Sequence, residues 1–382
     1  MEHYDPRRGN LPIGVEHSNC ARKTDGVSRR RFVTSLAAFG ASMVLPSGGS
    51  RAQTVPRGSG NQPNRPNRPN RIDVHHHTLP TPYLRSQRER ILSSVDSARI
   101  PQVLGWTPAR AVEEMDKYGV ATAITSIGGP GIWLGDVPAS RSLARACNEY
   151  SAQMVRDHPG RFGLFAALPL PDPEGSLREI EYALDTLQAD GFILLTSYGD
   201  KWPGDPAYAP VFEELNRRKA VVFFHPAAPA CCRNLIPGIP PVVTEFLFDT
   251  TRAITSLLFS GSFARFPDIR FIFTHAGGTM PVLASRIEGY IEQHPEILRR
   301  LPNGVPYELK KLHYDVANAV NPSSMAALMN LVPASQILFG CDFPFYPIGL
   351  TAGRLDDYGL SAADRQAIHR DNATRLFPRL KG

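Results

Sequence analysis

The sequence predicts one (β/α)8 barrel that starts at Ile72 and continues to the end of the chain. Short apolar runs alternate eight times with segments of helical period over about 310 residues, which is typical of parallel strands joined by helices. Several runs are continuously apolar, as expected of strands that are buried on both faces. Four runs end in histidine or aspartate, and barrel enzymes place their active sites at the carboxyl ends of strands.

The expected elements follow one another in strict order. The eight strands are residues 72–77, 120–127, 162–168, 191–195, 220–225, 270–275, 312–316 and 336–342. The segments of helical period are residues 108–118, 140–158, 175–188, 207–218, 251–266, 279–293, 322–331 and 361–376. The alternative is an open doubly wound sheet, which would need a glycine-rich phosphate loop after its first strand. His-His-His-Thr-Leu-Pro occupies that place, so the barrel is favoured.

The first 52 residues predict a twin-arginine export signal. Residues 28–33 read Ser-Arg-Arg-Arg-Phe-Val, a mildly apolar stretch follows over 34–45, and a small-residue site ends at Ala52. This apolar stretch is too short to span a bilayer of roughly 30 Å, so stable membrane insertion is not expected. We expect recognition by the twin-arginine machinery, cleavage near Ala52 and a periplasmic or exported protein. A basic amphipathic tail is the alternative.

Residues 53–71 predict an extended linker between this signal and the barrel domain of residues 72–382. Pro-Asn-Arg occurs three times in succession over residues 63–71. Proline at every third position favours polyproline II and excludes a helix. The linker is therefore expected to be a solvated spacer without a catalytic role.

The basic charge of the chain comes from its N-terminal region. The chain carries a net charge of +6 and a pI of about 9.1, but from Ile72 onward 30 Lys and Arg residues face 32 Asp and Glu residues. A nearly neutral barrel does not predict nucleic-acid binding. The five cysteines show no C-x-x-C spacing, which argues against a thiolate zinc site or a disulfide framework, although the adjacent Cys231 and Cys232 could oxidise in the periplasm.

The first strand carries a pair of candidate metal ligands. His75 and His77 lie two residues apart, so they point to one face of the strand and His76 points to the other. Two imidazoles in this arrangement can bind one divalent metal ion. A surface histidine cluster or an affinity-tag remnant is the alternative, but it fits poorly at the end of an apolar run far from either terminus.

Three more polar residues end other strands. The fifth run ends in His225, the sixth in His275 and the eighth in Asp342. A single histidine of this kind is more often a hydrogen-bonded core residue than a ligand. Four histidines and one aspartate at the same end of four strands instead predict a metal site at the mouth of the barrel.

These motifs resemble the amidohydrolase superfamily, and more closely its aminocarboxymuconate-semialdehyde decarboxylase-like branch. The similar segments are Asp73-x-His75-x-His77, the strand ending at His225, His275-Ala-Gly-Gly, Gly340-Cys-Asp342-x-Pro344 and the Asn-Ala-Thr-Arg-Leu-Phe of residues 372–377. Residues 192–200 and 210–226 are most similar to 6-methylsalicylate decarboxylases. The resemblance implies a barrel of the metal-dependent hydrolase type.

The resemblance also implies a role for each side chain at the strand ends. One divalent metal ion, commonly zinc and in some members manganese, would be bound by His75, His77, His225 and Asp342. His275 would stand beside the metal as an acid or base. No organic cofactor is implied. The relatives suggest a homodimer.

The resemblance further suggests where the substrate binds. Arg286 matches a position that holds a substrate carboxylate in relatives, sometimes from the neighbouring subunit, and a surface charge is the alternative. Aminocarboxymuconate-semialdehyde decarboxylases carry an arginine shortly before the second strand, where residues 105–108 read Gly-Trp-Thr-Pro. This difference favours a flat aromatic substrate, with Trp106 and Tyr198 as candidate walls. Core packing is the alternative for both.

The leading hypothesis is therefore non-oxidative decarboxylation of a hydroxybenzoate-like acid such as 6-methylsalicylate. The metal would bind the carboxylate and an ortho hydroxyl, and Asp342 or His275 would deliver a proton to the ring carbon as CO2 leaves. The same ligands would suit a metal-dependent hydrolase of a lactone, ester or amide, which is the first alternative. A catalytically inactive periplasmic binding barrel is the second.

Overall fold

The structure is a computed structural model, and it describes residues 70–93, 95, 97–232 and 235–381. The export signal and residues 53–69 of the linker lie outside these residues, so both stay predictions. Arg71, the last residue assigned to the linker, already belongs to the first strand. Within the described ranges, no helix combines the length and the apolar character needed to cross a bilayer.

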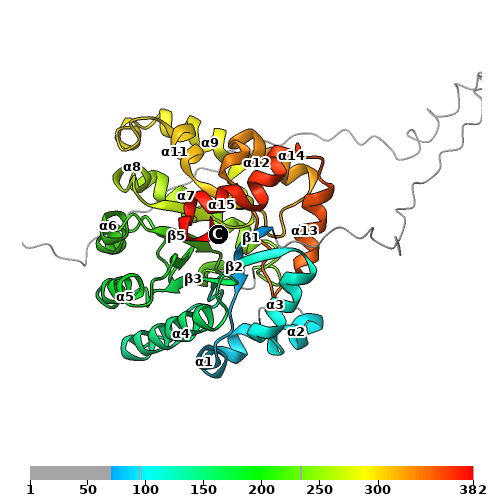
Figure 1. The fold of residues 1–382 in the computed structure, drawn as a ribbon. Coiled ribbons are helices and arrows are strands. Elements are labelled where there is room, and N and C mark those ends of the chain that lie inside the picture. Colours follow the sequence, from blue (N-terminus) through cyan, green and yellow to red (C-terminus); the bar gives the residue numbers. More distant parts are fainter. Residues whose placement is uncertain (1–69, 94, 96, 233–234, 382) are drawn as a thin grey trace, which may run out of the picture. The chain divides into compact units, whose positions relative to one another are not determined.

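Eight parallel strands form one sheet in the order of the sequence, which confirms the predicted (β/α)8 barrel (Figure 1). The strands are β1 (Arg71–His77), β2 (Val120–Ser126), β3 (Phe162–Ala167), β4 (Gly191–Leu195), β5 (Val221–His225), β6 (Arg270–Phe273), β7 (His313–Asp315) and β8 (Ile337–Leu338). The segment after β8 closes the barrel onto β1. The Val74 amide donates to the Phe339 carbonyl at 3.0 Å, and the Asp342 amide donates to the His75 carbonyl at 2.7 Å.

Helices surround the strands (Figure 1). The helices before β5 are α1 (Thr81–Leu92), α2 (Ile100–Leu104), α3 (Pro108–Lys117), α4 (Val137–Asp157), α5 (Pro173–Asp185) and α6 (Ala209–Arg217). They are followed by α7 (Glu245–Ser260), α8 (Ser262–Arg265), α9 (Met280–Glu292), α10 (Pro295–Leu298), α11 (Val305–Lys311), α12 (Pro322–Leu331), α13 (Ile348–Asp357), α14 (Ala362–Gln366) and α15 (Asn372–Leu376). A π-helical turn, η7 (Ala367–Asp371), joins the last two.

Local sequence signals start several of these helices. Thr107, Asp136, Asp172 and Asn321 each accept a hydrogen bond from an amide in the first turn of α3, α4, α5 and α12. Each of these caps is followed by a proline at the first or second helical position, where the missing amide hydrogen costs no helical hydrogen bond. The caps explain why the predicted and observed starts of α3 and α12 coincide.

β6 and β8 end two or more residues earlier than predicted, and both differences lie at the expected site. β6 stops at Phe273, two residues before His275, and β8 stops at Leu338, four residues before Asp342. His275 and Asp342 have φ angles of 54° and 67°, which are incompatible with a strand. The chain therefore leaves the sheet in order to aim these two side chains.

Aromatic side chains fill the barrel directly beneath the strand ends. The rings of Phe165 and Phe223 stack with centroids 5.2 Å apart. Phe223 also meets the His75 ring edge-on at 5.1 Å, and Phe377 from the C-terminal segment packs on Phe165 at 5.8 Å. Phe165 and Phe223 are fully buried, which stabilises the fold by roughly 1.5–3 kcal/mol each. This packing makes a rigid floor for the side chains above it.

Candidate metal centre

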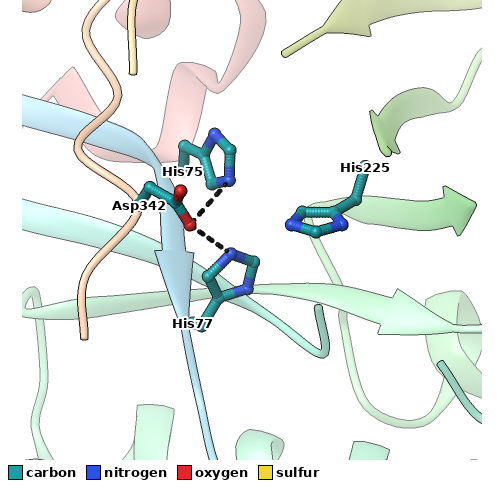
Figure 2. A group of neighbouring side chains, drawn as sticks. All are labelled: His75, His77, His225 and Asp342. Atoms are coloured by element: carbon teal, nitrogen blue, oxygen red, sulfur yellow. Dashed lines mark hydrogen bonds and ion pairs between the residues drawn. The ribbon is translucent and has the colours of Figure 1, made fainter. Parts of the chain in front are cut away.

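Three histidines and one aspartate converge at the mouth of the barrel. His75 and His77 come from β1, His225 ends β5, and Asp342 follows β8. One ligand atom from each of the four lies within 4.8 Å of the others. Figure 2 shows the His75 and His77 rings beside the Asp342 carboxylate, with His225 facing them. The Asp342 Oδ1 atom lies 3.0 Å from His77 Nε2 and 3.4 Å from His75 Nε2.

The Nδ1 atoms of the three histidines contact hydrogen-bond acceptors, and the Nε2 atoms of His75 and His77 face Asp342. The Nδ1 atom of His75 contacts the Asp315 carboxylate at 2.9 Å, and the Nδ1 atom of His225 contacts the Pro226 carbonyl at 2.9 Å. His77 Nδ1 lies 3.3 Å from the Ser126 carbonyl. Carboxylates and carbonyls only accept, so each Nδ1 atom carries a hydrogen and each Nε2 atom of a neutral ring presents a lone pair. Metal-binding histidines are oriented in this way.

The donor set fits a divalent transition metal. Three imidazole nitrogens and one carboxylate oxygen match the ligands of catalytic zinc sites. His75 Nε2 is buried without a hydrogen-bond partner, which is costly unless another group binds it. Burial lowers the pKa of His75, but the charges of Asp315 and Asp342 raise it to about 10, so this nitrogen attracts a cation or a proton. Burial and the neighbouring His77 and His75 rings hold the pKa of His225 well below its usual value.

Backbone strain is concentrated at the site. His275, Asn318 and Asp342 adopt φ angles of 54°, 53° and 67°, a region that non-glycine residues rarely occupy. Such positions cost on the order of 1–3 kcal/mol each and cluster at functional sites. Hydrogen bonds compensate here, because Asn318 Nδ2 donates to Asp342 Oδ2 at 3.0 Å and the Asp342 amide is held by β1.

Asp315, at the end of β7, organises one side of the site. Its Oδ2 atom binds His75 Nδ1, and its Oδ1 atom accepts from the amides of His275 at 3.1 Å and Ala317 at 2.9 Å. The carboxylate is fully buried. His275 Nδ1 in turn donates to the Ala317 carbonyl at 2.8 Å. Asp315 thus orients a metal ligand and the candidate acid or base together. The predicted seventh strand continues to Val316, so the sequence did not mark Asp315 as a strand-end residue.

Asp73 organises the opposite side. Its Oδ1 atom accepts from the amides of His75 at 3.0 Å and Cys341 at 3.1 Å. Its Oδ2 atom contacts His76 Nδ1 at 3.0 Å and Cys341 Sγ at 2.6 Å. One buried carboxylate therefore ties the end of β1 to the segment that carries Asp342.

A cavity of about 250 Å³ opens beside these side chains. His225, His275 and Asp342 line one part of it, whereas Phe246 and Phe345 supply aromatic walls. The Phe345 ring also meets the His77 ring at 5.1 Å. The structure thus brings the predicted acid or base to the same cavity as two of the predicted metal ligands, and we call this space the catalytic cavity.

Arg99 is a cavity residue that the sequence interpretation missed. It lines the catalytic cavity, donates from Nη1 to the Phe345 carbonyl at 2.6 Å, and lies 4.0 Å above the Tyr346 ring. Residues 105–108 contain no arginine, and the cationic group at this cavity comes from seven residues before Trp106. A guanidinium has five N–H donors, so donors remain for a substrate carboxylate.

The predicted substrate-binding residues lie outside this cavity. Trp106 is 6% exposed and packs in the hydrophobic core, so the structure does not place it against a substrate. Tyr198 lines an adjoining cavity instead. Arg286 is exposed on α9 and lines a separate depression of about 850 Å³ beside α7.

Comparison with known proteins agrees with this geometry. The amidohydrolase family model matches residues 72–379. The 6-methylsalicylic acid decarboxylase of Penicillium expansum is 35% identical over 320 residues, covering 82% of this chain and 97% of that protein. Decarboxylase yanB of Aspergillus niger is 34% identical over 329 residues, covering 81% and 88%. A dihydroxybenzoic acid decarboxylase from Polaromonas sp., crystallised with manganese and 2-nitroresorcinol, has a TM-score of 0.69 at 22% identity and covers 82% and 98%.

Proposed function

Since the chain belongs to the amidohydrolase family, we propose that it is a metal-dependent decarboxylase that releases CO2 from a small aromatic acid with a hydroxyl group beside the carboxylate. The observation that carries the proposal is the meeting of four buried metal donors, a histidine and an arginine around one aromatic-walled cavity. The names of the similar proteins support the aromatic acid and the reaction. We take 6-methylsalicylate as the test substrate.

One divalent metal ion would be held by His75, His77, His225 and Asp342. The ligands suit zinc, and manganese is the alternative because the structurally similar dihydroxybenzoic acid decarboxylase holds it. When bound, the ion supplies positive charge that holds the acidic oxygens of the substrate and withdraws electrons from the ring.

The remaining cavity groups orient the acid. Arg99 would bind the carboxylate through a charge-assisted hydrogen bond, and the rings of Phe246 and Phe345 would sandwich or border the aromatic ring. The catalytic cavity has room for one substituted benzene ring. Bound in this way, the ring carbon that bears the carboxylate is held against the proton donor.

Two side chains can carry the proton that replaces CO2. Burial raises the pKa of Asp342, but His75 and His77 hold it well below its usual value, so Asp342 starts as a carboxylate and must first take a proton from the substrate. His275 donates Nδ1–H to the Ala317 carbonyl, so any proton it delivers leaves from Nε2. Solvent deuterium exchange into the ring of the phenol product, measured in His275→Gln and Asp342→Asn variants of known metal content, will identify the donor.

Homodimer formation is part of the proposal. Arg286 lies in a depression with the exposed side chains of Phe248 and Tyr290, on α7 and α9. A second copy of the chain that covered this face would remove the two aromatic rings from water. Arg286 of one copy would then extend toward the catalytic cavity of the other copy. Sedimentation of wild type and an Arg286→Glu variant, together with KM for the acid, tests both statements.

The central experiment is metal analysis combined with CO2 release. Wild type is expected to bind one metal ion per chain and to convert 6-methylsalicylate into CO2 and a phenol. His77→Ala is expected to lose both properties, whereas His294→Ala, at a helix boundary away from the site, keeps both. Metal binding without CO2 release from any hydroxybenzoate would reject decarboxylation and favour hydrolysis. A wild type that binds no metal after reconstitution would reject the site itself.

A further inference from the structure

A second cavity of about 450 Å³ adjoins the catalytic cavity, and we call it the side chamber. Three residues line both spaces: Ser93, Gly129 and Phe246. Trp133 and Tyr198 form much of the rest of its wall, together with the Pro-Ala-Ala-Pro-Ala segment that follows His225. The side chamber is larger than the catalytic cavity, so it exceeds what a methyl substituent on the ring would require.

Four hydroxyl or guanidinium side chains line the side chamber, and each makes at least one hydrogen bond within the protein. Ser93 Oγ donates to the Arg90 carbonyl, and the Arg90 guanidinium donates to Gln87 Oε1 at 3.0 Å and to the Trp133 carbonyl at 3.1 Å. Ser197 Oγ donates to the buried Asp249 carboxylate at 2.8 Å. Tyr198 holds its hydroxyl against the Leu195 amide at 2.8 Å.

Apolar side chains form most of the side chamber wall. Aromatic, leucine, proline and alanine side chains line it, and the hydroxyl and guanidinium side chains among them already make hydrogen bonds within the protein. A ligand group with its own donors or acceptors would lose hydrogen bonds to water on entering. A hydrocarbon group would lose none and would gain from the removal of its surface from water.

Gly129 keeps the boundary between the two cavities open. A Cβ atom at this position would approach nothing closer than His225 Cε1 and the Pro226 carbonyl oxygen, both at 3.9 Å. The absence of a side chain at Gly129 thus leaves space beside His225, where the catalytic cavity meets the side chamber. A Cβ atom would fit there without displacing its neighbours, and a larger side chain would narrow the boundary.

We propose that the side chamber binds an alkyl substituent longer than methyl on the aromatic acid, so that the substrates of this enzyme are alkyl-substituted hydroxybenzoates. The proposal rests on the proposed decarboxylase function and narrows it. The carboxylate and hydroxyl occupy the catalytic cavity, and the alkyl chain passes Gly129 and lies against Trp133 and Tyr198. Specificity then comes from the apolar chamber, whereas the chemistry comes from the metal site.

The test is a substrate series with methyl, propyl or pentyl at ring position 6 or ring position 4 of salicylate. One of the two series is expected to gain about fourfold in kcat/KM for each added methylene, because each buried methylene contributes a nearly constant free energy. Wild-type kcat/KM that stays flat or falls with chain length in both series overturns the proposal. If 6-methylsalicylate is converted but chain length brings no gain, only this inference fails. If no acid in the panel releases CO2, the proposed function fails with it.

Two variants locate the effect in the side chamber. Ala228→Leu fills the chamber at a half-buried wall position, and Gly129→Val narrows the boundary. Both are expected to lower the ratio of pentyl to methyl kcat/KM by about tenfold or more. Ala334→Leu introduces the same change at a half-buried position before β8, at the other end of the barrel, and is expected to keep the wild-type ratio.

Binding provides a readout that does not depend on turnover. Titration of 3-pentylphenol and 3-methylphenol into wild type is expected to show tighter binding of the pentyl compound, and Ala228→Leu is expected to remove the difference. A pentyl preference that survives in both Ala228→Leu and Gly129→Val, with thermal midpoints confirming that both variants fold, would place the alkyl chain elsewhere and overturn the proposal.

Discussion

At the scale of single residues, Asp73 shows how a side chain that does not contact the cavity can set the geometry of the site. It accepts hydrogen bonds from the amides of His75 and Cys341. His75 is itself a candidate metal ligand on β1, and Cys341 directly precedes the candidate ligand Asp342. Both amides are in the barrel interior, where an unpaired N–H group costs about 1–3 kcal/mol.

Asp73→Ala is therefore expected to weaken metal affinity by roughly 10–100-fold, as the loss of groups that orient metal ligands typically does. Asp73→Asn retains one acceptor oxygen and should recover most of the affinity. Competition with a coloured chelator measures both dissociation constants. A folded Asp73→Ala protein with the wild-type dissociation constant would show that the strand ends hold the ligands without this carboxylate.

Arg99 is the second residue whose role can be separated from the metal. Its side chain lines the catalytic cavity, and its guanidinium stacks over the Tyr346 ring. Arg99→Met keeps the stem and removes the charge, so KM for the acid is expected to rise about 10–100-fold, the value of a hydrogen bond between charged groups. Affinity for the phenol product, which lacks a carboxylate, should change little.

Arg110→Met is the matched control, because Arg110 is exposed and its guanidinium donates to the nearby Gly105 carbonyl. Steady-state kinetics on the three proteins measure the effect. If Arg99→Met lowers kcat and leaves KM unchanged, the arginine acts in the reaction step and not in binding the carboxylate.

At the scale of elements, the π-helical turn η7 buries an ionisable group. His369 is 6% exposed, meets the Phe339 ring edge-on at 5.9 Å and lies 3.5 Å from Asp356. The Nη2 atom of Arg71 donates to both carboxylate oxygens of the same aspartate, at 2.8 and 2.6 Å. Burial and the positive charge of Arg71 lower the pKa of His369 to about 4.

Because of His369, we expect the folded protein to lose stability in mild acid. The unfolded chain protonates His369 near pH 6.5 while the folded protein resists protonation until about pH 4, so the unfolded state binds more protons in that window. The free energy of unfolding should fall as the pH drops from 6.5 to 4, by up to about 3 kcal/mol from this group. Above pH 6.5 both states are neutral and the contribution is constant.

His369→Leu should remove this part of the pH dependence. Leucine suits the apolar contact with Phe339 and does not titrate. Denaturant unfolding at several pH values measures the free energy of unfolding of variant and wild type. The pH dependence of metal binding is common to both proteins and cancels in the difference. His294→Leu, at a helix boundary, is the control and should keep the wild-type slope. Parallel curves for wild type and His369→Leu would contradict the assignment.

At the scale of the whole molecule, the metal centre joins strands that are distant in the sequence. Its ligands come from β1, from β5 and from the segment after β8 that closes the barrel. A ligand that binds only the folded state stabilises it by mass action, by about 4 kcal/mol when its concentration is a thousand times the dissociation constant. Metal binding is thus expected to stabilise the closed barrel.

Chelation should therefore lower the midpoint of thermal unfolding by roughly 5–10 °C, and added zinc or manganese should restore it. Lower pH should weaken the metal's effect, because the charges that raise the pKa of His75 favour a proton as well as a metal ion. Calorimetry of wild type and His77→Ala measures the shift. The variant should already melt at the chelated midpoint, whereas a wild-type midpoint that chelator does not move would contradict a structural contribution of the metal.

Much of the barrel and part of its site followed from local patterns. The eight strands were recognisable because each is an apolar run bounded by turns, and α3 and α12 because a capping residue and a proline mark their starts. Helix α1 was missed because only Tyr83, Gln87 and Ile91 of its residues are buried, which leaves little apolar periodicity.

The sequence by itself determined the succession of strands and helices and the polar side chains that end or follow the strands. Apolar runs and the alternation of side chains are patterns among neighbouring residues, so the chain records them locally. His75, His77, His225 and Asp342 meet because parallel strands bring their carboxyl ends to one mouth. Only the tertiary structure decided that Arg99 and Asp315 belong to the site, that Trp106 belongs to the core, and that a side chamber adjoins the catalytic cavity. These facts depend on contacts between distant segments, which no local pattern in the chain records.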